Sequence, residues 1–291
     1  MIYNNLAYGF RKIIKTSVTL MVITMVLAAC SCFAYDEILK LQELAVNWPV
    51  ELLALCGMSS AFGLNASLMV FYILITLFNI AAIACCAGMA VSIIRQDDRN
   101  GMIIHYLNQP FNKLQIFTIK LILSILFALF QWLLYILFLG ASVYFICMHF
   151  DISFANEWSH IISIATNGLP ILLLALAICL LYAIVSANRM GYVYYLITTF
   201  SFSLLIGNAY KIFDLIAYYM RSGQIDDSTI VSISETLKKL RLFFPFTLLN
   251  RLNTEKAPLP PSAMSIYVVI SILLLGLCGY MYMTKSIENN D

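Results

Sequence analysis

The residues most able to do chemistry lie between two long apolar runs, in RQDDRNGMIIHYLNQPFNKLQIFTIK, from Arg95 to Lys120. The chain is only 11% charged, yet two basic and two acidic residues fall within the first five positions of this stretch. Carboxylates favour the start of a helix through its dipole, and proline ends a helix. The stretch therefore predicts a short helix from Asp97 to Leu107, stopped by Pro110. Its charges would form a docking surface for a soluble partner.

Sequence motifs for catalysis and for nucleotide or metal binding are absent. No GxxxxGK[ST], HExxH, GxSxG or CxxC occurs, so we expect neither P-loop ATP binding nor a catalytic centre in this chain. His105, His149 and His160 lack metal-ligand spacing, and we expect the last two at the outer surface. Most of the eight cysteines fall inside apolar runs, where cysteine is a small apolar filler. The sequence thus predicts no enzyme, no metal and no cofactor.

Six stretches have the length and composition of membrane-spanning helices. Apolar residues make up 62% of 291, against about 45–50% in soluble domains, and a spanning helix needs about 20 of them. Only helices satisfy the backbone polar groups of such runs in lipid. We therefore expect one all-α polytopic domain over 1–291, with a third span that is longer than a bilayer requires. The expected spans are 13–34, 65–94, 114–148, 161–187, 191–216 and 265–283.

The amino-terminal residues predict a helix on the membrane surface. Tyr3, Ala7, Phe10 and Ile14 share one helical face, which is typical of an amphipathic helix lying on the inner leaflet; a frayed basic tail is the alternative. LAAC at Leu27–Cys30 looks like a lipoprotein cleavage site. We expect an uncut first span instead, because cleavage would leave an odd number of spans and put the termini on opposite sides.

Basic residues set the expected orientation. On one side of the predicted spans they are Arg11, Lys12, Lys15, Arg95, Arg99, Lys113, Arg189 and Lys285. The short loops on the other side carry little positive charge, so the positive-inside rule predicts a cell-membrane protein with both termini in the cytoplasm. Loop 217–263 is external by helix counting, and from Ser232 it predicts an amphipathic helix that Pro245 stops. The net charge of +2 gives no reason to expect a nucleic-acid partner.

Ionisable residues are nearly missing inside the six expected spans. Lys120 and Lys211 lie near span ends, where a lysine can snorkel to the interface. Ion-coupled transporters usually keep acidic groups at mid-membrane. An intramembrane hydrolase would need an Asp pair, a metal or a Ser–His pair within the bundle. The sequence therefore indicates a bundle without an energy source or catalytic groups of its own.

The charged stretch resembles the signature of one family. Asp97 to Ile103 (DDRNGMI), then Gln109-Pro110, then Lys120, is similar to the signature of ABC-2 type permeases, the membrane subunits of type-2 ABC exporters. That signature reads roughly E-R-E-x-G-T-[LI], then a small residue and proline, then glycine and lysine. The spacing of nine from Gly101 to Pro110, and of ten from Pro110 to Lys120, matches it. The departures are Asp97 for Glu, Met102 for Thr and Ile119 for Gly.

The resemblance implies six spans, an amphipathic amino-terminal interfacial helix and a cytoplasmic coupling helix. It also implies two permease chains that face each other in the lipid, each contacting a separate ATPase subunit that binds ATP and Mg. ATP-driven closure of the ATPases would push on the coupling helices and switch the cavity between inward and outward access. The ATPase-coupling residues would be Asp97, Asp98, Arg99, Asn100, Gly101, His105 and Leu107, with Pro110 and Lys120 as structural motif residues. An ordinary solvated loop is the alternative for these positions.

The cargo is the property that the sequence constrains least. In the family, spans two and five commonly line the route, and here they carry aromatic, hydroxyl and amide side chains without charge. Possible route residues are Asn79, Tyr194, Tyr195, Thr198 and Thr199. Interhelical hydrogen bonding is the alternative explanation for them. An uncharged lining suits an amphipathic peptide of the bacteriocin, toxin or immunity type; hydrophobic drugs, lipid-linked glycans, or a scaffold or sensor role without transport are the alternatives.

Overall fold

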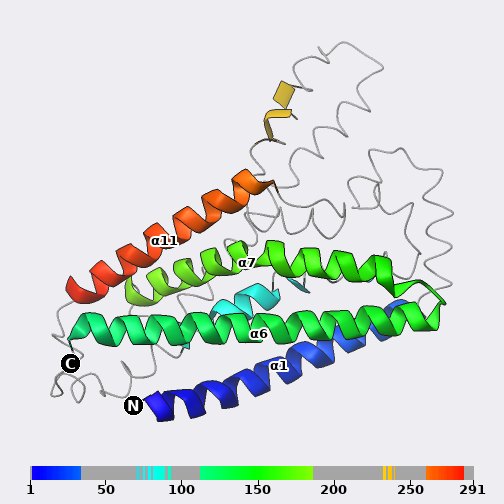
Figure 1. Cartoon of the computed structure of the whole chain (residues 1–291), viewed down its shortest axis with the longest axis horizontal. Helices are drawn as coiled ribbons and strands as arrows, with labels where there is room; N and C mark the ends of the chain where they lie inside the picture. The colour runs from blue at the N-terminus through cyan, green and yellow to red at the C-terminus, as the bar shows by residue number, and fades with distance from the viewer. Residues whose placement is uncertain are drawn as a thin grey trace.

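The computed structural model describes residues 2–33, 112–185 and 260–284, together with individual positions within 71–92 and 232–239. In these parts of the chain every regular element is a helix and no strand is present. The long helices are α1 (Ile2–Phe33), α6 (Lys113–His149), α7 (Phe154–Val185) and α11 (Pro261–Thr284) (Figure 1). The predicted all-α class is confirmed for the described residues.

All four long helices are long and apolar enough to cross a membrane, so the chain is a multi-pass membrane protein. Over the described residues they coincide with four of the predicted spans, 13–34, 114–148, 161–187 and 265–283. In the second predicted span, the described positions from Phe71 to Ser92 are helical. The fifth predicted span, 191–216, lies outside the described residues. In the predicted outer loop, the described positions from Ser232 to Lys239 are helical.

Two spans begin earlier than the sequence predicts. The helix α7 starts at Phe154 rather than at 161, and Glu157 in its first turn complements the helix dipole. The helix α11 starts at Pro261 rather than at 265, because proline lacks the N–H that would be unsatisfied at a first helical position. The longer α7 also corrects the placement of His160, which is buried at 5% exposure and not at the outer surface.

The amino-terminal segment is helical, but it is not a separate interfacial helix. One continuous helix, α1, runs from Ile2 to Phe33. The segment contains no proline, and its one glycine, Gly9, does not interrupt the helix. The prediction of an independent helix lying on the membrane surface is therefore corrected: the amphipathic stretch is the first part of the first spanning helix.

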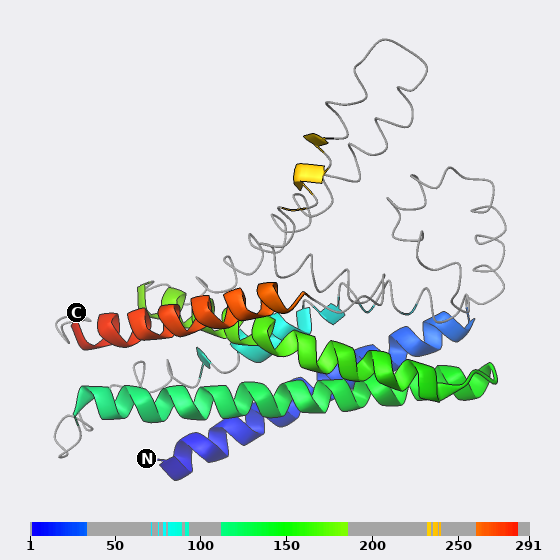
Figure 2. The same cartoon turned by 45° about the horizontal axis from the view of Figure 1, so that its top comes forward.

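The helices α1 and α6 run in one direction, and α7 and α11 run in the other (Figures 1 and 2). Contacts between aromatic side chains show how α6, α7 and α11 lie relative to one another. The ring centroids of Phe117, near the start of α6, and Tyr282, near the end of α11, are 5.0 Å apart. Those of Tyr144, near the end of α6, and Phe154, at the start of α7, are 5.3 Å apart. The starts of α1 and α6 therefore lie at the same end of the bundle as the ends of α7 and α11 (Figure 1).

The length of α6 exceeds the thickness of a bilayer core, as the sequence predicts for the third span. Its 37 residues correspond to about 55 Å at 1.5 Å per residue, against about 30 Å of hydrocarbon. At its start, the Asn112 backbone N–H donates to Gln115 Oε1 at 3.1 Å, which is one half of a capping box. Since no tilt of ordinary size absorbs the difference in length, α6 extends beyond the hydrocarbon.

The helix α1 packs against α6, which it crosses obliquely (Figure 2). Ser17, Thr24 and Ser31 recur at intervals of seven and are buried, together with Leu20 and Ala28. Small side chains let two backbones approach closely in lipid. The hydroxyl groups of two of these residues bond within α1, because Thr24 Oγ1 donates to the Met21 carbonyl at 2.9 Å and Ser31 Oγ to the Leu27 carbonyl at 2.8 Å.

Trp132 makes a close contact between α6 and α7. Its Nε1 donates to the Ala165 carbonyl at 3.2 Å. Its ring lies on Gly168, where an added Cβ would be 3.1 Å from Cη2 and closer still to Cζ2. Pro170 lies inside α7 and lacks the N–H that would bond to the carbonyl of Thr166, which loosens the helix next to this contact. The glycine admits the indole ring, so the contact depends on the absence of a side chain at residue 168.

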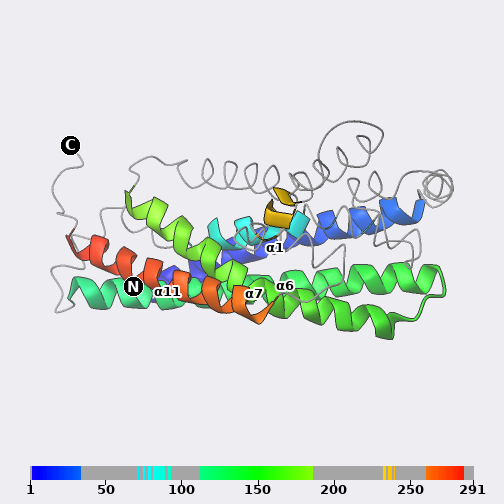
Figure 3. The same cartoon turned by 90° about the horizontal axis from the view of Figure 1, so that it is seen from above.

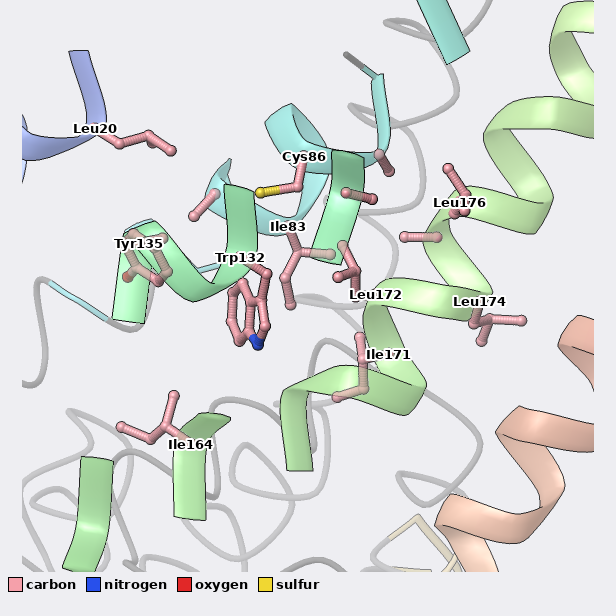
Figure 4. Packing of buried hydrophobic residues seen from close by; sticks show 14 of the residues in the cluster. Leu20, Ile83, Cys86, Trp132, Tyr135, Ile164, Ile171, Leu172, Leu174 and Leu176 are labelled. Carbon is pink, nitrogen blue, oxygen red and sulfur yellow. The ribbon is translucent and has the colours of Figure 1, made fainter. Parts of the chain in front are cut away.

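The core lies between this helix pair, α1 and the described positions around Ile83 (Figures 3 and 4). Ile83 lies between Trp132 of α6 and Leu172 of α7, with Cys86 close by, and Tyr135 lies on the other side of Trp132 (Figure 4). These side chains are buried, whereas the outward faces of α1, α6 and α11 carry exposed apolar residues, as expected of surfaces that contact lipid.

Candidate functional site

Most of the predicted site residues lie outside the described part of the chain. They are the coupling residues Asp97, Asp98, Arg99, Asn100, Gly101, His105 and Leu107, the motif residue Pro110, and the possible route residues Tyr194, Tyr195, Thr198 and Thr199. Their roles stay predictions. The structure describes Asn79 and Lys120, and the possible functional site within the described residues is built from their surroundings.

Lys120 is buried inside the protein, with 1% of its surface exposed. It shares a helical face of α6 with Phe117 and Ser124, which lie three residues before it and four after it and are also buried. The expectation that Lys120 snorkels to the membrane interface is therefore corrected. Helical periodicity turns its side chain toward the other helices of the bundle.

Asn79 is fully buried and is hydrogen-bonded to Tyr135 of α6. Figure 4 shows the residues around Tyr135. Tyr135 Oη donates a hydrogen bond to Asn79 Oδ1. The Tyr135 ring is held on two further sides, by Trp132 at a centroid distance of 5.4 Å and by Phe78 at 6.0 Å. This is the geometry of an interhelical hydrogen bond, the alternative explanation for Asn79; its role in a cargo route stays a prediction.

Tyr135→Phe should lower the free energy of unfolding by about 1 kcal/mol, because the Asn79 carboxamide would be left buried without its bond to α6. Thermal unfolding of the purified protein in detergent measures this. The matched control is Tyr280→Phe, since Tyr280 is 62% exposed on α11 and should tolerate the loss of its hydroxyl. Equal unfolding temperatures for the two variants would mean that the hydrogen bond does not stabilise the bundle.

Two more carboxamides are buried on α6 and α7, next to the contact of Trp132 with α7. Gln131 is one helical turn before Tyr135 on α6 and has 0% exposure. Asn167 is buried in the part of α7 that faces Trp132. Gln131 directly precedes Trp132, and Asn167 directly precedes Gly168, on which the Trp132 ring lies. On antiparallel helices, the residues just before two facing positions point to the same side of the contact, so Gln131 and Asn167 share one side. We call Asn79, Gln131 and Asn167 the carboxamide layer.

Each member of the carboxamide layer has a buried polar atom without a hydrogen-bond partner among the described residues. These atoms are Asn79 Nδ2, both Nε2 and Oε1 of Gln131, and Asn167 Oδ1. The Asn167 Nδ2 atom donates within α7, to the Ser163 carbonyl at 2.7 Å and to Ser163 Oγ at 3.1 Å. Buried polar groups are nearly always paired, so the layer has unused hydrogen-bonding capacity.

Gln131 and Asn167 are not among the residues predicted from the sequence, although a signal for them is present. Both are polar residues inside long apolar runs, and such residues in membrane helices usually bond between helices or serve function. The predicted route residues come only from spans two and five, so the neutral amides of α6 and α7 are not among them.

Aromatic residues surround the turn between α6 and α7. We call Tyr144, Phe145, Phe150, Phe154 and Trp158 the aromatic tip. The His149 ring stacks on Phe145 at a centroid distance of 6.4 Å and meets Phe150 edge-on at 4.7 Å. Amphipathic aromatic rings are typical of the boundary between lipid and water.

The residues in the described part of the chain form neither a metal site nor a disulfide. No group of three or more His, Cys, Asp or Glu residues there could hold a metal ion. The seven described cysteines are free thiols. The groups available for binding in this part are uncharged hydrogen-bond donors and acceptors, buried among apolar side chains.

The chain matches no protein-family model, no curated protein and no solved structure. The fold and the carboxamide layer therefore define the class of the protein by themselves. It is a multi-pass α-helical membrane protein with uncharged polar groups buried between its helices.

Proposed function

We propose that the chain is the transmembrane permease subunit of an ATP-driven exporter of the ABC-2 type. The observation that carries the proposal is the spacing of Gly101, Pro110 and Lys120 behind a cluster of charges. The structure supports it in one respect: α6 begins at Lys113, so the segment between Asp97 and Pro110 directly precedes a spanning helix. A helix in that position could pass force from a soluble subunit into the membrane bundle.

The directions of the four helices support six membrane crossings. The end of α1 is opposite to the end of the bundle at which α6 begins (Figure 1). We therefore propose that each of the two links, from α1 to α6 and from α7 to α11, crosses the membrane once. One crossing in each link gives six, with both chain ends on one side, which the positive-inside rule assigns to the cytoplasm of the cell membrane.

The proposed partners follow from what the chain lacks. A separate ATPase subunit would bind ATP and Mg, and a second permease chain, the same or a related one, would complete the exporter. The proposed cargo is an amphipathic peptide of the bacteriocin, toxin or immunity type. The neutral amides buried between the helices favour this class over an ion, because uncharged donors and acceptors suit peptide groups.

Purification of the tagged chain from its native membrane tests the proposal. Mass measurement of the mild-detergent complex should show two permease chains with two ATPase subunits, and the complex should hydrolyse ATP faster when cargo peptide is added. A tagged, unrelated polytopic protein from the same membrane is the control for non-specific recovery. Isolation of the chain without any ATPase, at full recovery of folded protein, would contradict the proposal and favour a scaffold or sensor.

A further inference from the structure

The carboxamide layer is neutral, and the described charges of its two helices are distant along the chain. Lys120 precedes Gln131 by eleven residues, which is about 16 Å along α6. Glu157 precedes Asn167 by ten residues, which is about 15 Å along α7. A ligand held at this level would therefore meet uncharged donors and acceptors, not an ion-pair partner.

The unused atoms of the layer comprise both donors and acceptors. Asn79 Nδ2 and Gln131 Nε2 offer N–H groups, while Gln131 Oε1 and Asn167 Oδ1 offer carbonyl oxygens. A secondary amide presents the complementary pair, one carbonyl oxygen and one N–H. In a trans amide these two groups point in opposite directions, so Gln131 can pair with one of them and another member of the layer with the other.

We propose that the carboxamide layer binds an uncharged backbone amide of the transported peptide. The inference rests on the proposed export of peptides and adds a contact site on α6 and α7. Unpaired amides are costly away from water, so a guest that pairs them is held more tightly than one of equal hydrophobicity that cannot. The layer should therefore distinguish an amide from an ester, because an ester has no N–H to donate a hydrogen bond to Gln131 Oε1 or Asn167 Oδ1.

Binding of two neutral peptides to the full chain in lipid nanodiscs tests the proposal. One is an acetylated and amidated Leu/Ala octapeptide with a fluorophore, and the other is its analogue with backbone esters in place of amides. Fluorescence anisotropy gives both affinities, and empty nanodiscs correct for partition into lipid. The wild-type protein should bind the amide peptide about tenfold more tightly than the ester.

Gln131→Leu should abolish this preference and bind both peptides equally. Leucine is similar in size and buries no polar atom, so the variant should unfold at the same temperature as the wild type or higher. The matched control is Ser142→Ala, which removes another buried, unpartnered polar atom of α6 outside the layer and should keep the preference.

Three outcomes would overturn the proposal: equal binding of both peptides by the wild type, a preference that survives Gln131→Leu, or a preference lost equally in Ser142→Ala. Equal binding by the wild type would assign the layer to buried water. The assay contains no ATPase, so its failure is separate from failure of the export proposal. A chain that prefers the amide peptide but purifies without an ATPase would keep the site and lose the exporter role.

Discussion

Replacing Asp98 and Arg99 together by alanine should weaken association with the ATPase subunit by well over tenfold. The two residues lie in the charged segment that precedes α6, outside the described residues. Truncating one partner of a charge pair that is buried at an interface costs about 2–5 kcal/mol, and about 1.4 kcal/mol is tenfold in affinity. Surface substitutions of this kind usually change folding stability by about 0.5 kcal/mol or less. The variant should therefore insert and fold but lose its partner.

Recovery of the ATPase with the tagged variant, and cargo-stimulated ATP turnover of the recovered complex, measure this effect. Asn156→Ala is the control, because Asn156 is exposed near the start of α7, beside the aromatic tip. If the double variant binds its ATPase and exports at the normal rate, the charged segment is a solvated connector and the coupling role is wrong.

Gly168→Leu should destabilise the protein by about 3 kcal/mol, the upper part of the range for overpacking a core. A side chain at residue 168 would overlap the Trp132 ring, which its hydrogen bond to Ala165 holds in place. Thermal unfolding in detergent, followed by the fraction that stays monodisperse, measures the loss. The matched control is Gly276→Leu, since a Cβ at Gly276 on α11 meets nothing within 4 Å.

A second substitution tests whether overlap with the Trp132 ring causes the loss of stability in Gly168→Leu. Trp132→Ala removes the ring that the introduced leucine side chain would overlap, so the double variant should be more stable than the sum of the two single losses allows. If the two losses add, the destabilisation by leucine has another origin. A Gly168→Leu protein as stable as the Gly276→Leu control would show that the helices separate without cost.

The sequence predicted the spans well where a long apolar run defines them, as in Lys113–His149. It placed the start of α7 too late because Asn156, Glu157, Ser159 and His160 make residues 154–160 resemble a loop, although they continue the helix. It separated the first residues of α1 from the span because amphipathic periodicity does not show whether a helix bends. Burial of His160 and Lys120 was missed for a related reason: hydropathy gives depth in a membrane but not the direction of a side chain.

The candidate site shows where local reasoning stops. The pairing of Asn79 with Tyr135 joins residues 56 positions apart, and no local pattern specifies it. The fit of Gly168 to Trp132 is likewise a contact between two helices, visible in the sequence only as a glycine within one span and a tryptophan within another. Such lateral contacts depend on the register between helices, which helix pairing and not helix formation determines.

The contact between Trp132 and Gly168 also has a mechanical consequence. A ring seated against a glycine resists the sliding of one helix along the other in either direction, so α6 and α7 should move together at this contact. A force applied at Lys113 would then be transmitted along α6 to its other end, about 55 Å away.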